Sequence, residues 1–268
     1  MIQAGVLGSP ISHSLSPILH RTAYAALGVT AQYSAYEVGS GNLIKFLNEG
    51  GKSLNCLSLT MPLKEEALEI ATHVSDIALQ ISSGNTLYKN DDEWHLTSTD
   101  VEGFSYALAA HERSVSGKVL IIGAGATARA VAAACTASCE TLTVVTRSNS
   151  REKSIVKAAA GMSVDFVDWG SEPSMDSFDL VVNTTPGDSA AKFANSVMAP
   201  QGILFELIYN PWPTQLLASW KKSGGSTIDG LELLIHQAIS QVEIFTSQKV
   251  NRTELAAMMR IEGLKALK

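Results

Sequence analysis

The sequence has no basic excess, no cysteine framework and no long apolar run. Its 268 residues carry a net charge of −6, which argues against a nucleic-acid or anionic-membrane partner because both require a basic face. Cys56, Cys135 and Cys139 form no C-x-x-C pair, and we predict small buried thiols rather than redox chemistry. No charged leader region and no membrane-length apolar window is present. These absences predict a reduced, cytoplasmic protein of enzyme size that does not bind nucleic acid or membranes.

Apolar and polar segments instead alternate along the chain with the periods of strands and helices. We expect strands at 4–7, 32–38, 56–60, 86–89, 94–97, 118–122, 141–145, 164–167, 180–183 and 203–207. We expect helices at 17–27, 41–49, from 62 through 70, and at 101–110, 123–138 and 231–248. The polar turn 90–93 predicts a hairpin. The alternation predicts an α/β protein with parallel strands and crossover helices, and the length allows two domains.

A serine-rich run follows the first strand. If the backbone is extended there, Ser14 and Ser16 point the same way, and Pro17 suits the first turn of a helix. Hydroxyls and free N–H groups at a helix N-terminus form an anion site. A serine-rich loop that only caps the helix is the alternative.

A second signal is the run Gly123-x-Gly125-x-x-Ala128, which follows a strand and opens a helix. This context is typical of a dinucleotide-binding loop, in which the glycines permit close approach of the pyrophosphate to the backbone. The next strand ends at Arg147 with no carboxylate at its tip. An arginine there can pair with the 2′-phosphate of NADP, so we predict NADP as cofactor, with Arg151 or Lys153 able to assist.

Lys64 lies at the start of the helix predicted from residue 62. The helix dipole disfavours a cation at that end, which suits a lysine that exchanges protons. Asp100, at the junction of the two halves, would hold the lysine charged if it lies close. A solvated surface lysine is the alternative.

Taken together, these motifs resemble the shikimate dehydrogenase family, because they recur in the family's order over nearly the whole chain. They are Ser14-Leu15-Ser16-Pro17, Thr60-x-Pro62-x-Lys64, Gly84-Asn85-Thr86, Thr99-Asp100-x-x-Gly103, the glycine loop, Asn183-x-Thr185, Tyr209-Asn210-Pro211 and Gly230 with Gln237. The resemblance implies reversible reduction of 3-dehydroshikimate to shikimate with NADPH. It also implies that Lys64 transfers the proton and that Asp100 pairs with it.

The resemblance further implies two groups of binding residues. The substrate would be held by Ser14, Ser16, Thr60, Lys64, Asn85, Asp100, Tyr209 and Gln237. NADP would be held by Gly123, Ala124, Gly125, Ala126, Thr127, Ala128, Thr146, Arg147, Ser148, Asn183, Thr184, Thr185, Leu207 and Gly230. Gln237 also interrupts an apolar helical stripe, so its buried amide needs polar partners.

The implied organisation has two domains with the active site in a cleft between them. Residues 1–99 and 231–268 would form an N-terminal α/β substrate domain completed by the C-terminal helices. Residues 100–230 would form a Rossmann-like NADP-binding domain. We expect a small-molecule substrate, no resident metal, and a monomer or homodimer.

Several positions depart from the family's common pattern. Ser58 and Ser98 replace the usual Asn, Glu206 an Asp, Ala126 a third loop glycine, and Thr146 an Asn; Ser82-Ser83 also differs. The alternatives are an NAD-dependent quinate/shikimate dehydrogenase, a non-catalytic dinucleotide-binding regulator and a folate-linked dehydrogenase of similar shape. Ser16, rather than Thr, and Arg147 argue against the first. Lys64 with Asp100 argues against the second, and the serine run against the third.

Overall fold

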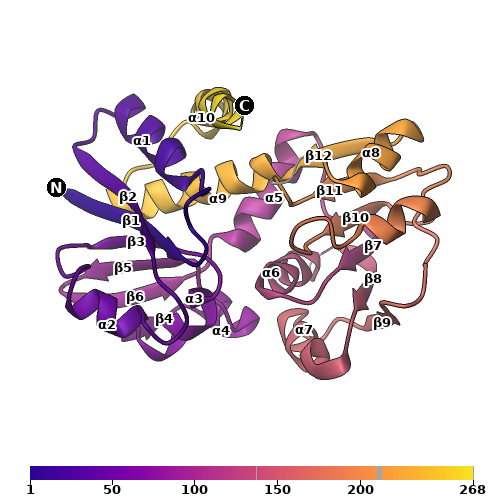
Figure 1. The fold of residues 1–268 in the computed structure, drawn as a ribbon, viewed down its shortest axis with the longest axis horizontal. Helices are drawn as coiled ribbons and strands as arrows, with labels where there is room; N and C mark the ends of the chain where they lie inside the picture. The colour runs from indigo at the N-terminus through magenta and orange to yellow at the C-terminus, as the bar shows by residue number, and fades with distance from the viewer. Residues whose placement is uncertain (137, 210–212, 268) are drawn as a thin grey trace. The chain divides into compact units, whose positions relative to one another are not determined.

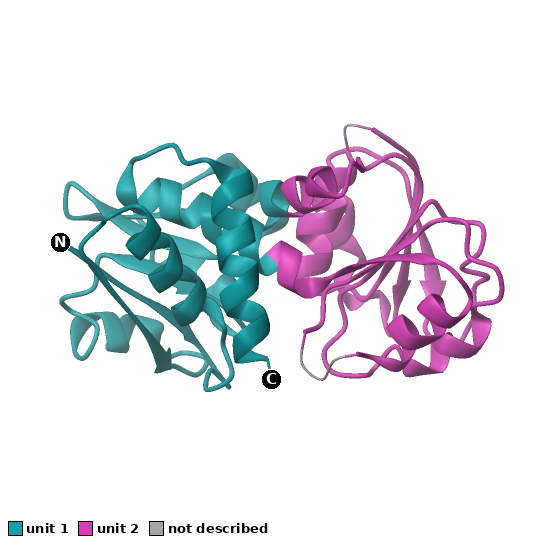
Figure 2. Cartoon of the chain, turned by 90° about the horizontal axis from the view of Figure 1, so that it is seen from above, with its two compact units in different colours: residues 1–103, 234–268 teal, residues 104–233 magenta. Residues whose placement is uncertain are grey.

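The computed structural model describes residues 1–136, 138–209 and 213–267 (Figure 1). The chain divides into two compact units, shown in different colours in Figure 2. Unit 1 comprises residues 1–103 and 234–268, and unit 2 comprises residues 104–233. The boundaries fall inside helices α5 (Asp100–Ala110) and α9 (Gly230–Thr246).

Unit 1 contains a six-stranded mixed sheet in the order β2-β1-β3-β5-β6-β4. Its strands are β1 (Ile2–Gly8), β2 (Ala31–Glu37), β3 (Cys56–Leu59), β4 (His73–Val74), β5 (Thr86–Asn90) and β6 (Glu93–Thr97). β1 pairs in parallel with β2 and β3, whereas β5 is antiparallel to β3 and to β6. The hairpin predicted around residues 90–93 is therefore confirmed as β5–β6, and it makes the sheet of this half mixed rather than parallel.

The helices of unit 1 pack against its sheet or against one another. They are α1 (Ser16–Ala26), α2 (Leu43–Asn48), α3 (Leu63–Glu66), α4 (Asp76–Ile81), α10 (Arg252–Ala266) and the end of α9, with the 3₁₀ turn η1 (Ala67–Glu69). One core cluster joins Leu7 and Leu57 of the strands to Leu43 and Leu63 of the helices, all fully buried. This packing anchors the segments that follow β1 and β3.

Unit 2 contains a six-stranded parallel sheet in the order β12-β11-β10-β7-β8-β9. Its strands are β7 (Gly117–Ile122), β8 (Cys139–Thr146), β9 (Val164–Asp168), β10 (Leu180–Asn183), β11 (Ile203–Glu206) and β12 (Ser226–Asp229). Its other elements are α6 (Ala126–Cys135), α7 (Glu152–Ala158), α8 (Gln215–Lys222) and the 3₁₀ turns η2 (Asn149–Arg151) and η3 (Ala191–Ser196). This strand order is that of the Rossmann fold, and its switch point lies between β7 and β10.

The predicted α/β class is confirmed, and most element positions agree within a few residues. The hairpin turns through Asp91 and Asp92, whose φ angles of 49° and 64° suit a tight turn. The helix predicted from 62 through 70 is present, but only its first turn is α-helical (α3), and it continues as the 3₁₀ turn η1 to Glu69. The carbonyl of Lys64 accepts from the N–H of Gly84 (2.8 Å), so it is bonded outside its own helix.

Two further expectations are corrected. The segment before α1 is not extended: Ser14 N–H donates to Ile11 O in a turn, and Leu15 has helical dihedrals. Cys139 is partly exposed and begins β8, whereas Cys56 and Cys135 are buried thiols. In the described residues, no helix is long and apolar enough to cross a bilayer.

Candidate functional site

Lys64 and Asp100 form a close ion pair at the centre of a polar cluster in unit 1. Lys64 Nζ lies 2.6 Å from Asp100 Oδ2, and the two side chains are only 17% and 9% exposed. Lys64 is placed by α3, directly after β3, and Asp100 is the first residue of α5. The pairing that the sequence predicted for these residues is therefore seen in the structure.

Asn85 joins the second oxygen of this carboxylate to the rest of the cluster through hydrogen bonds. Its Nδ2 donates to Asp100 Oδ1 (2.8 Å) and to Gln237 Oε1 (3.1 Å). Its Oδ1 accepts from the backbone N–H of Thr99 (2.8 Å). Because a backbone N–H can only donate, this bond fixes which end of the Asn85 amide faces Asp100.

Gln237, on α9, completes the cluster. Its Oε1 accepts from Asn85, and its Nε2 donates to Leu234 O (2.7 Å) within the same helix. The close approach of α5 to α9 requires Gly103, because a Cβ there would lie 2.8 Å from Gln237 Cβ. The polar partners predicted for the buried amide of Gln237 are therefore groups of the protein itself. Binding of substrate by Gln237 stays a prediction.

The segment that leads into the serine run lies beside the Thr60 motif, where the parallel strands β1 and β3 end. Thr60 N–H donates to Leu7 O (2.9 Å), and a Cβ on Gly8 would lie 2.3 Å from Thr60 Cγ2. Ser14 is half-buried, and its Oγ accepts from Ser16 N–H (3.3 Å), which leaves its proton available to a ligand. Ser16 is buried at the first position of α1.

The glycine loop of unit 2 leaves open space at a helix N-terminus. Gly123 has φ +109°, and a Cβ there would lie 2.5 Å from Thr184 Oγ1. A Cβ on Gly125 would meet nothing within 4 Å, and α6 begins at the next residue. Ala128 is fully buried. Free N–H groups beside open space fit a pyrophosphate. The remaining loop residues are Ala124, Ala126 and Thr127.

Asn183 and its neighbours line the other side of the switch point. Asn183 Nδ2 donates to Glu206 Oε1 (2.8 Å), and its Oδ1 accepts from Thr185 Oγ1 (2.7 Å). Burial raises the pKa of the Glu206 carboxyl. Leu207 N–H donates to Asn183 O (3.1 Å), and a Cβ on Gly230 would lie 2.4 Å from Leu207 O. These predicted cofactor residues therefore meet at the ends of β10, β11 and β12.

Arg147 is exposed just beyond β8, as an arginine that binds phosphate requires. Its guanidinium carbon lies 5.9 Å from the centre of the Trp169 ring, within range of a cation–π contact. Lys192 Nζ lies 5.8 Å from the same ring. Sequence reasoning missed Trp169 and Lys192, since no motif links these distant segments. Thr146 Oγ1 donates to Ser148 O (2.9 Å) and shapes the turn that carries Arg147.

Arg151, Lys153 and Tyr209, also predicted as site residues, take part in none of the contacts described above. Arg151 and Lys153 are exposed in η2 and at the start of α7. Burial raises the pKa of the Tyr209 phenol, which stays neutral. The adjacent Asn210 and Pro211 of the predicted motif lie outside the described residues.

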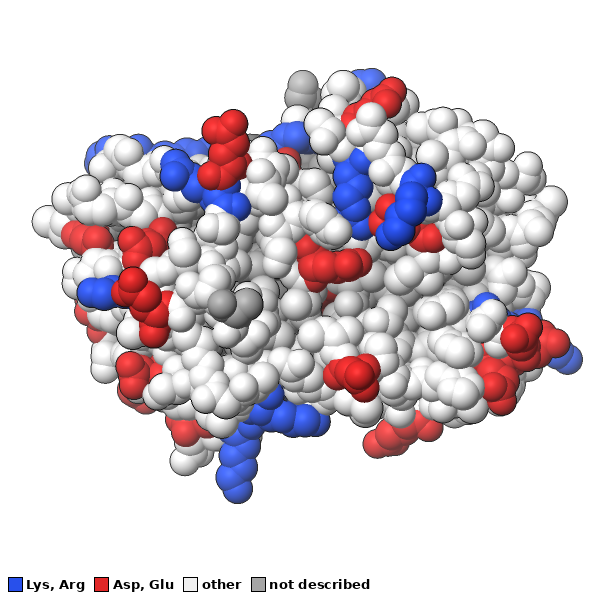
Figure 3. Space-filling model, turned by 180° about the vertical axis from the view of Figure 1, so that it is seen from behind, with Lys and Arg blue, Asp and Glu red and all other residues white. Residues whose placement is uncertain are grey.

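Basic and acidic side chains are interspersed on the face drawn in Figure 3. Among the residues that the structure describes, no group of three or more His, Cys, Asp or Glu side chains is placed to hold a metal ion.

Comparisons with known proteins find relatives of this chain in sequence and in structure. Residues 6–87 match the family model described as "Shikimate dehydrogenase substrate binding domain". The chain is 34% identical over 261 residues to a shikimate dehydrogenase (NADP(+)) of Prochlorococcus marinus (strain AS9601), covering 90% of each chain.

Solved structures are similar over almost the whole chain. Shikimate dehydrogenase of Mycobacterium tuberculosis superposes with a TM-score of 0.88 at 33% identity, covering 97% of this chain and 100% of that one. Shikimate 5-dehydrogenase of Thermus thermophilus, in complex with NADP(H) and shikimate, superposes with a TM-score of 0.85 at 28% identity, covering 98% and 100%.

Proposed function

We propose, from the premise that the chain belongs to the shikimate dehydrogenase family, that it reversibly reduces 3-dehydroshikimate to shikimate with NADPH. The observation that carries the proposal is the Lys64–Asp100 pair, enclosed by Asn85 and Gln237. A close cation and carboxylate inside a cluster of neutral amides suits proton transfer to a developing alkoxide. The relatives' dependence on NADP(+) supports the choice of cofactor.

In this mechanism Lys64 acts at the reacting oxygen. Bound NADPH supplies the hydride, and the Lys64 ammonium gives a proton to the carbonyl oxygen as negative charge develops there. Asp100 holds the ammonium in place through Oδ2. In the reverse direction, the neutral amine accepts the proton from the substrate hydroxyl.

The other substrate contacts divide by chemistry. We assign the substrate carboxylate to Ser14 and Ser16, because hydroxyls at a helix start suit an anion. We assign the ring hydroxyls to Thr60, Asn85 and Gln237 together with Asp100, because amides and carboxylates both exchange hydrogen bonds with hydroxyls. Tyr209 is assigned to the carboxylate side by resemblance alone.

The fit of unit 2 to NADP rests on the open space at Gly125 and on exposed Arg147. The pyrophosphate would lie against the loop from Gly123 to Ala128, and the 2′-phosphate against Arg147, with Thr146 and Ser148 shaping its turn. The far side of the site would be formed by Asn183, Thr184, Thr185, Leu207 and Gly230.

We further propose residues 1–99 and 231–268 as the substrate domain and residues 100–230 as the NADP domain. A cytoplasmic location is supported by three free thiols. We also propose that the protein acts on a small molecule as a monomer or homodimer; the shikimate-bound structures of relatives support the small-molecule substrate.

The function is tested by following NADPH or NADH formation at 340 nm with shikimate or quinate and with NADP or NAD. The expected result is that shikimate with NADP gives the highest kcat/KM, since Ser16 and Arg147 both favour that pair. A preference for quinate with NAD would contradict the specificity. No turnover with any pair would instead support a dinucleotide-binding regulator.

A further inference from the structure

A second set of buried polar residues lies behind the substrate cluster and touches neither Lys64 nor Asp100. Tyr33 and Ser58 come from β2 and β3, Gln241 from α9 and Thr86 from β5. All four side chains are at most 5% exposed. Burying a hydrogen-bonding group costs free energy unless it finds a partner. Four such groups in one place therefore indicate a structural or functional role.

The four side chains form one continuous line of hydrogen bonds. Tyr33 Oη donates to Ser58 Oγ (2.6 Å), and Ser58 Oγ donates to Gln241 Oε1 (2.7 Å). Gln241 Nε2 donates to Asn85 O (2.9 Å) and to Thr86 Oγ1 (3.0 Å). Thr86 Oγ1 then donates to Asn85 Oδ1 (2.7 Å). The line therefore ends on the Asn85 side chain.

Each proton in this line has a fixed direction. Asn85 O can only accept, so the amino group of Gln241 must face β5 and its oxygen must face Ser58. Ser58 gives its proton to that oxygen, and Tyr33 must then give its own to Ser58. Burial raises the pKa of the Tyr33 phenol, against the opposing effect of its hydrogen bonds with Ser58 and Ser16, so the phenol remains a donor.

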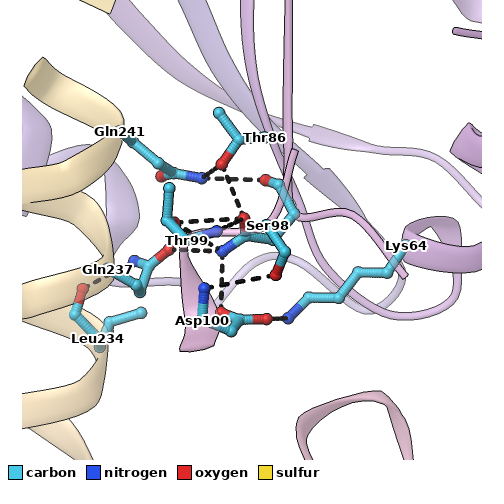
Figure 4. Close-up of polar contacts among 9 residues, drawn as sticks. Lys64, Thr86, Ser98, Thr99, Asp100, Leu234, Gln237 and Gln241 are labelled. Carbon is cyan, nitrogen blue, oxygen red and sulfur yellow. Dashed lines mark hydrogen bonds and ion pairs between the residues drawn. The ribbon is translucent and has the colours of Figure 1, made fainter. Parts of the chain in front are cut away.

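Gln241 also lies one helical turn after Gln237 on α9 (Figure 4). Side chains four residues apart share one face of a helix. The bonds of Gln241 to β3 and β5 thus hold the face of α9 from which Gln237 reaches Asn85. Both amides that we assign to the substrate depend on this attachment.

We propose that Gln241 is a positioning residue that, with Ser58, sets Asn85 and Gln237 in their bonding orientation before the substrate arrives. The proposal rests on the function proposed above. It assigns no contact between Gln241 and substrate. It also gives a reason for serine at position 58, since Ser58 both accepts from Tyr33 and donates to Gln241.

The first test replaces Gln241 with Met, which keeps the length of the side chain and removes its polar atoms. We expect KM for shikimate to rise about tenfold, the loss of one or two hydrogen bonds. We expect kcat to fall less than about threefold and KM for NADP to stay unchanged. The matched control is Ser240→Ala, on the same helix α9, which removes a partly buried hydrogen bond donated by Arg252 of α10. Unchanged KM in Gln241→Met, or an equal rise in the control, would overturn the proposal.

Gln241→Glu gives a readout that a space-filling role would not move. An ionised carboxylate cannot donate to Asn85 O, whereas a protonated one can donate there and accept from Ser58. The titratable groups beside this position are His20 of α1 and Tyr33 of β2, and burial lowers the pKa of the first to about 4 and raises that of the second, so both stay neutral in the wild type over this pH range. Burial also raises a carboxyl pKa, so the ratio of KM in the variant to KM in the wild type should fall as the pH is lowered from 9 to 6. A ratio independent of pH would overturn the proposal even if Gln241→Met fails to fold.

A third readout needs no turnover and separates this inference from the function. The side-chain NH₂ protons of Asn85, observed by ¹⁵N NMR, should shift and exchange with solvent faster in Gln241→Met and remain unchanged in Ser240→Ala. If the wild type does not oxidise shikimate but these protons respond, the proposed function fails and the positioning stands. If shikimate is oxidised and they do not respond, the positioning fails.

Discussion

The two units present their proposed ligands with different chemical groups. In unit 1 the side chains of Lys64, Asp100, Asn85 and Gln237 are bonded to one another. In unit 2 the loop around Gly125 presents backbone and open space. A protein recognises a polyol through many directional hydrogen bonds, whereas a pyrophosphate requires backbone N–H groups and open space beside them. The first site should therefore be sensitive to side-chain deletion and the second to side-chain addition.

The largest effect that we expect is the loss of turnover in Lys64→Ala. Without its general acid, kcat should fall at least about a hundredfold, while NADP binding in unit 2 is unchanged. Steady-state assays with shikimate and NADP measure the first, and protein-fluorescence titration with NADPH measures the second. The control is Lys52→Ala, an exposed lysine of the same unit. Near-normal turnover would remove Lys64 from the mechanism.

Substitutions at the two loop glycines should separate folding from binding. Gly123→Ala forces an L residue to φ +109° beside Thr184, so we expect the free energy of unfolding to fall by about 1–2 kcal/mol. Gly125→Ala meets no chain atom within 4 Å and should unfold like the wild type, yet raise KM for NADP about tenfold by occupying ligand space. Denaturant unfolding measures the stability of both variants, and steady-state assays measure their KM for NADP. Equal destabilisation by both would contradict it.

Arg147→Ala should sharpen the comparison, because it tests a side-chain contact within unit 2. Loss of a charge-assisted pair with the 2′-phosphate should raise KM for NADP about tenfold or more, with KM for NAD unchanged. Arg113→Ala, an exposed arginine elsewhere in the unit, is the control. An equal rise for both cofactors would place Arg147 outside the 2′-phosphate site.

The smallest effects concern pH, and they have opposite signs in the two units. Burial lowers the pKa of His20 in unit 1 to about 4. The unfolded histidine binds a proton below about pH 6.5, so unit 1 should lose stability as the pH falls from there to about 4. Hydrogen exchange resolved by unit measures this, and His20→Gln should flatten the dependence. An equal dependence in the variant would contradict it.

Burial raises the pKa of Glu206 in unit 2. The unfolded carboxyl releases its proton near pH 4.3, whereas the folded one retains it to higher pH. Unit 2 should therefore lose stability as the pH rises above that value through the raised pKa. Glu206→Gln should remove this loss of stability, as measured by the same hydrogen-exchange experiment. A pH dependence that persists in the variant would contradict the prediction.

Much of the fold could be predicted from local sequence patterns, because turn residues and hydrophobic periodicity decide where most of its strands and helices lie. The glycine loop, the strand before it and the hairpin at Asp91-Asp92 each follow from turn and period rules. The single-turn length of α3 could not be read in this way. The carbonyl of Lys64 accepts from Gly84, twenty residues away, and no local pattern predicts that bond.

Motifs in the sequence predicted some residues of the site, whereas contacts between distant segments place the others. Lys64 and Asp100 were found because their motifs resemble a family, and the structure joins them. Gln241 and Trp169 were not found, since the partners of each come from other segments of the chain. Ser58 is 183 residues from Gln241, and Arg147 and Trp169 follow the neighbouring strands β8 and β9. The turn at Ser14 was misread as extended because its backbone bond to Ile11 has no sequence signature.

The most direct test of the division between the units is a crossed pair of titrations. Shikimate and NADP are titrated separately into Ser14→Ala and Gly125→Val by calorimetry. The account predicts that Ser14→Ala weakens shikimate about tenfold and leaves NADP unchanged, while Gly125→Val weakens NADP at least tenfold and leaves shikimate unchanged. Loss of both ligands in either variant, or the reverse pattern, would contradict it.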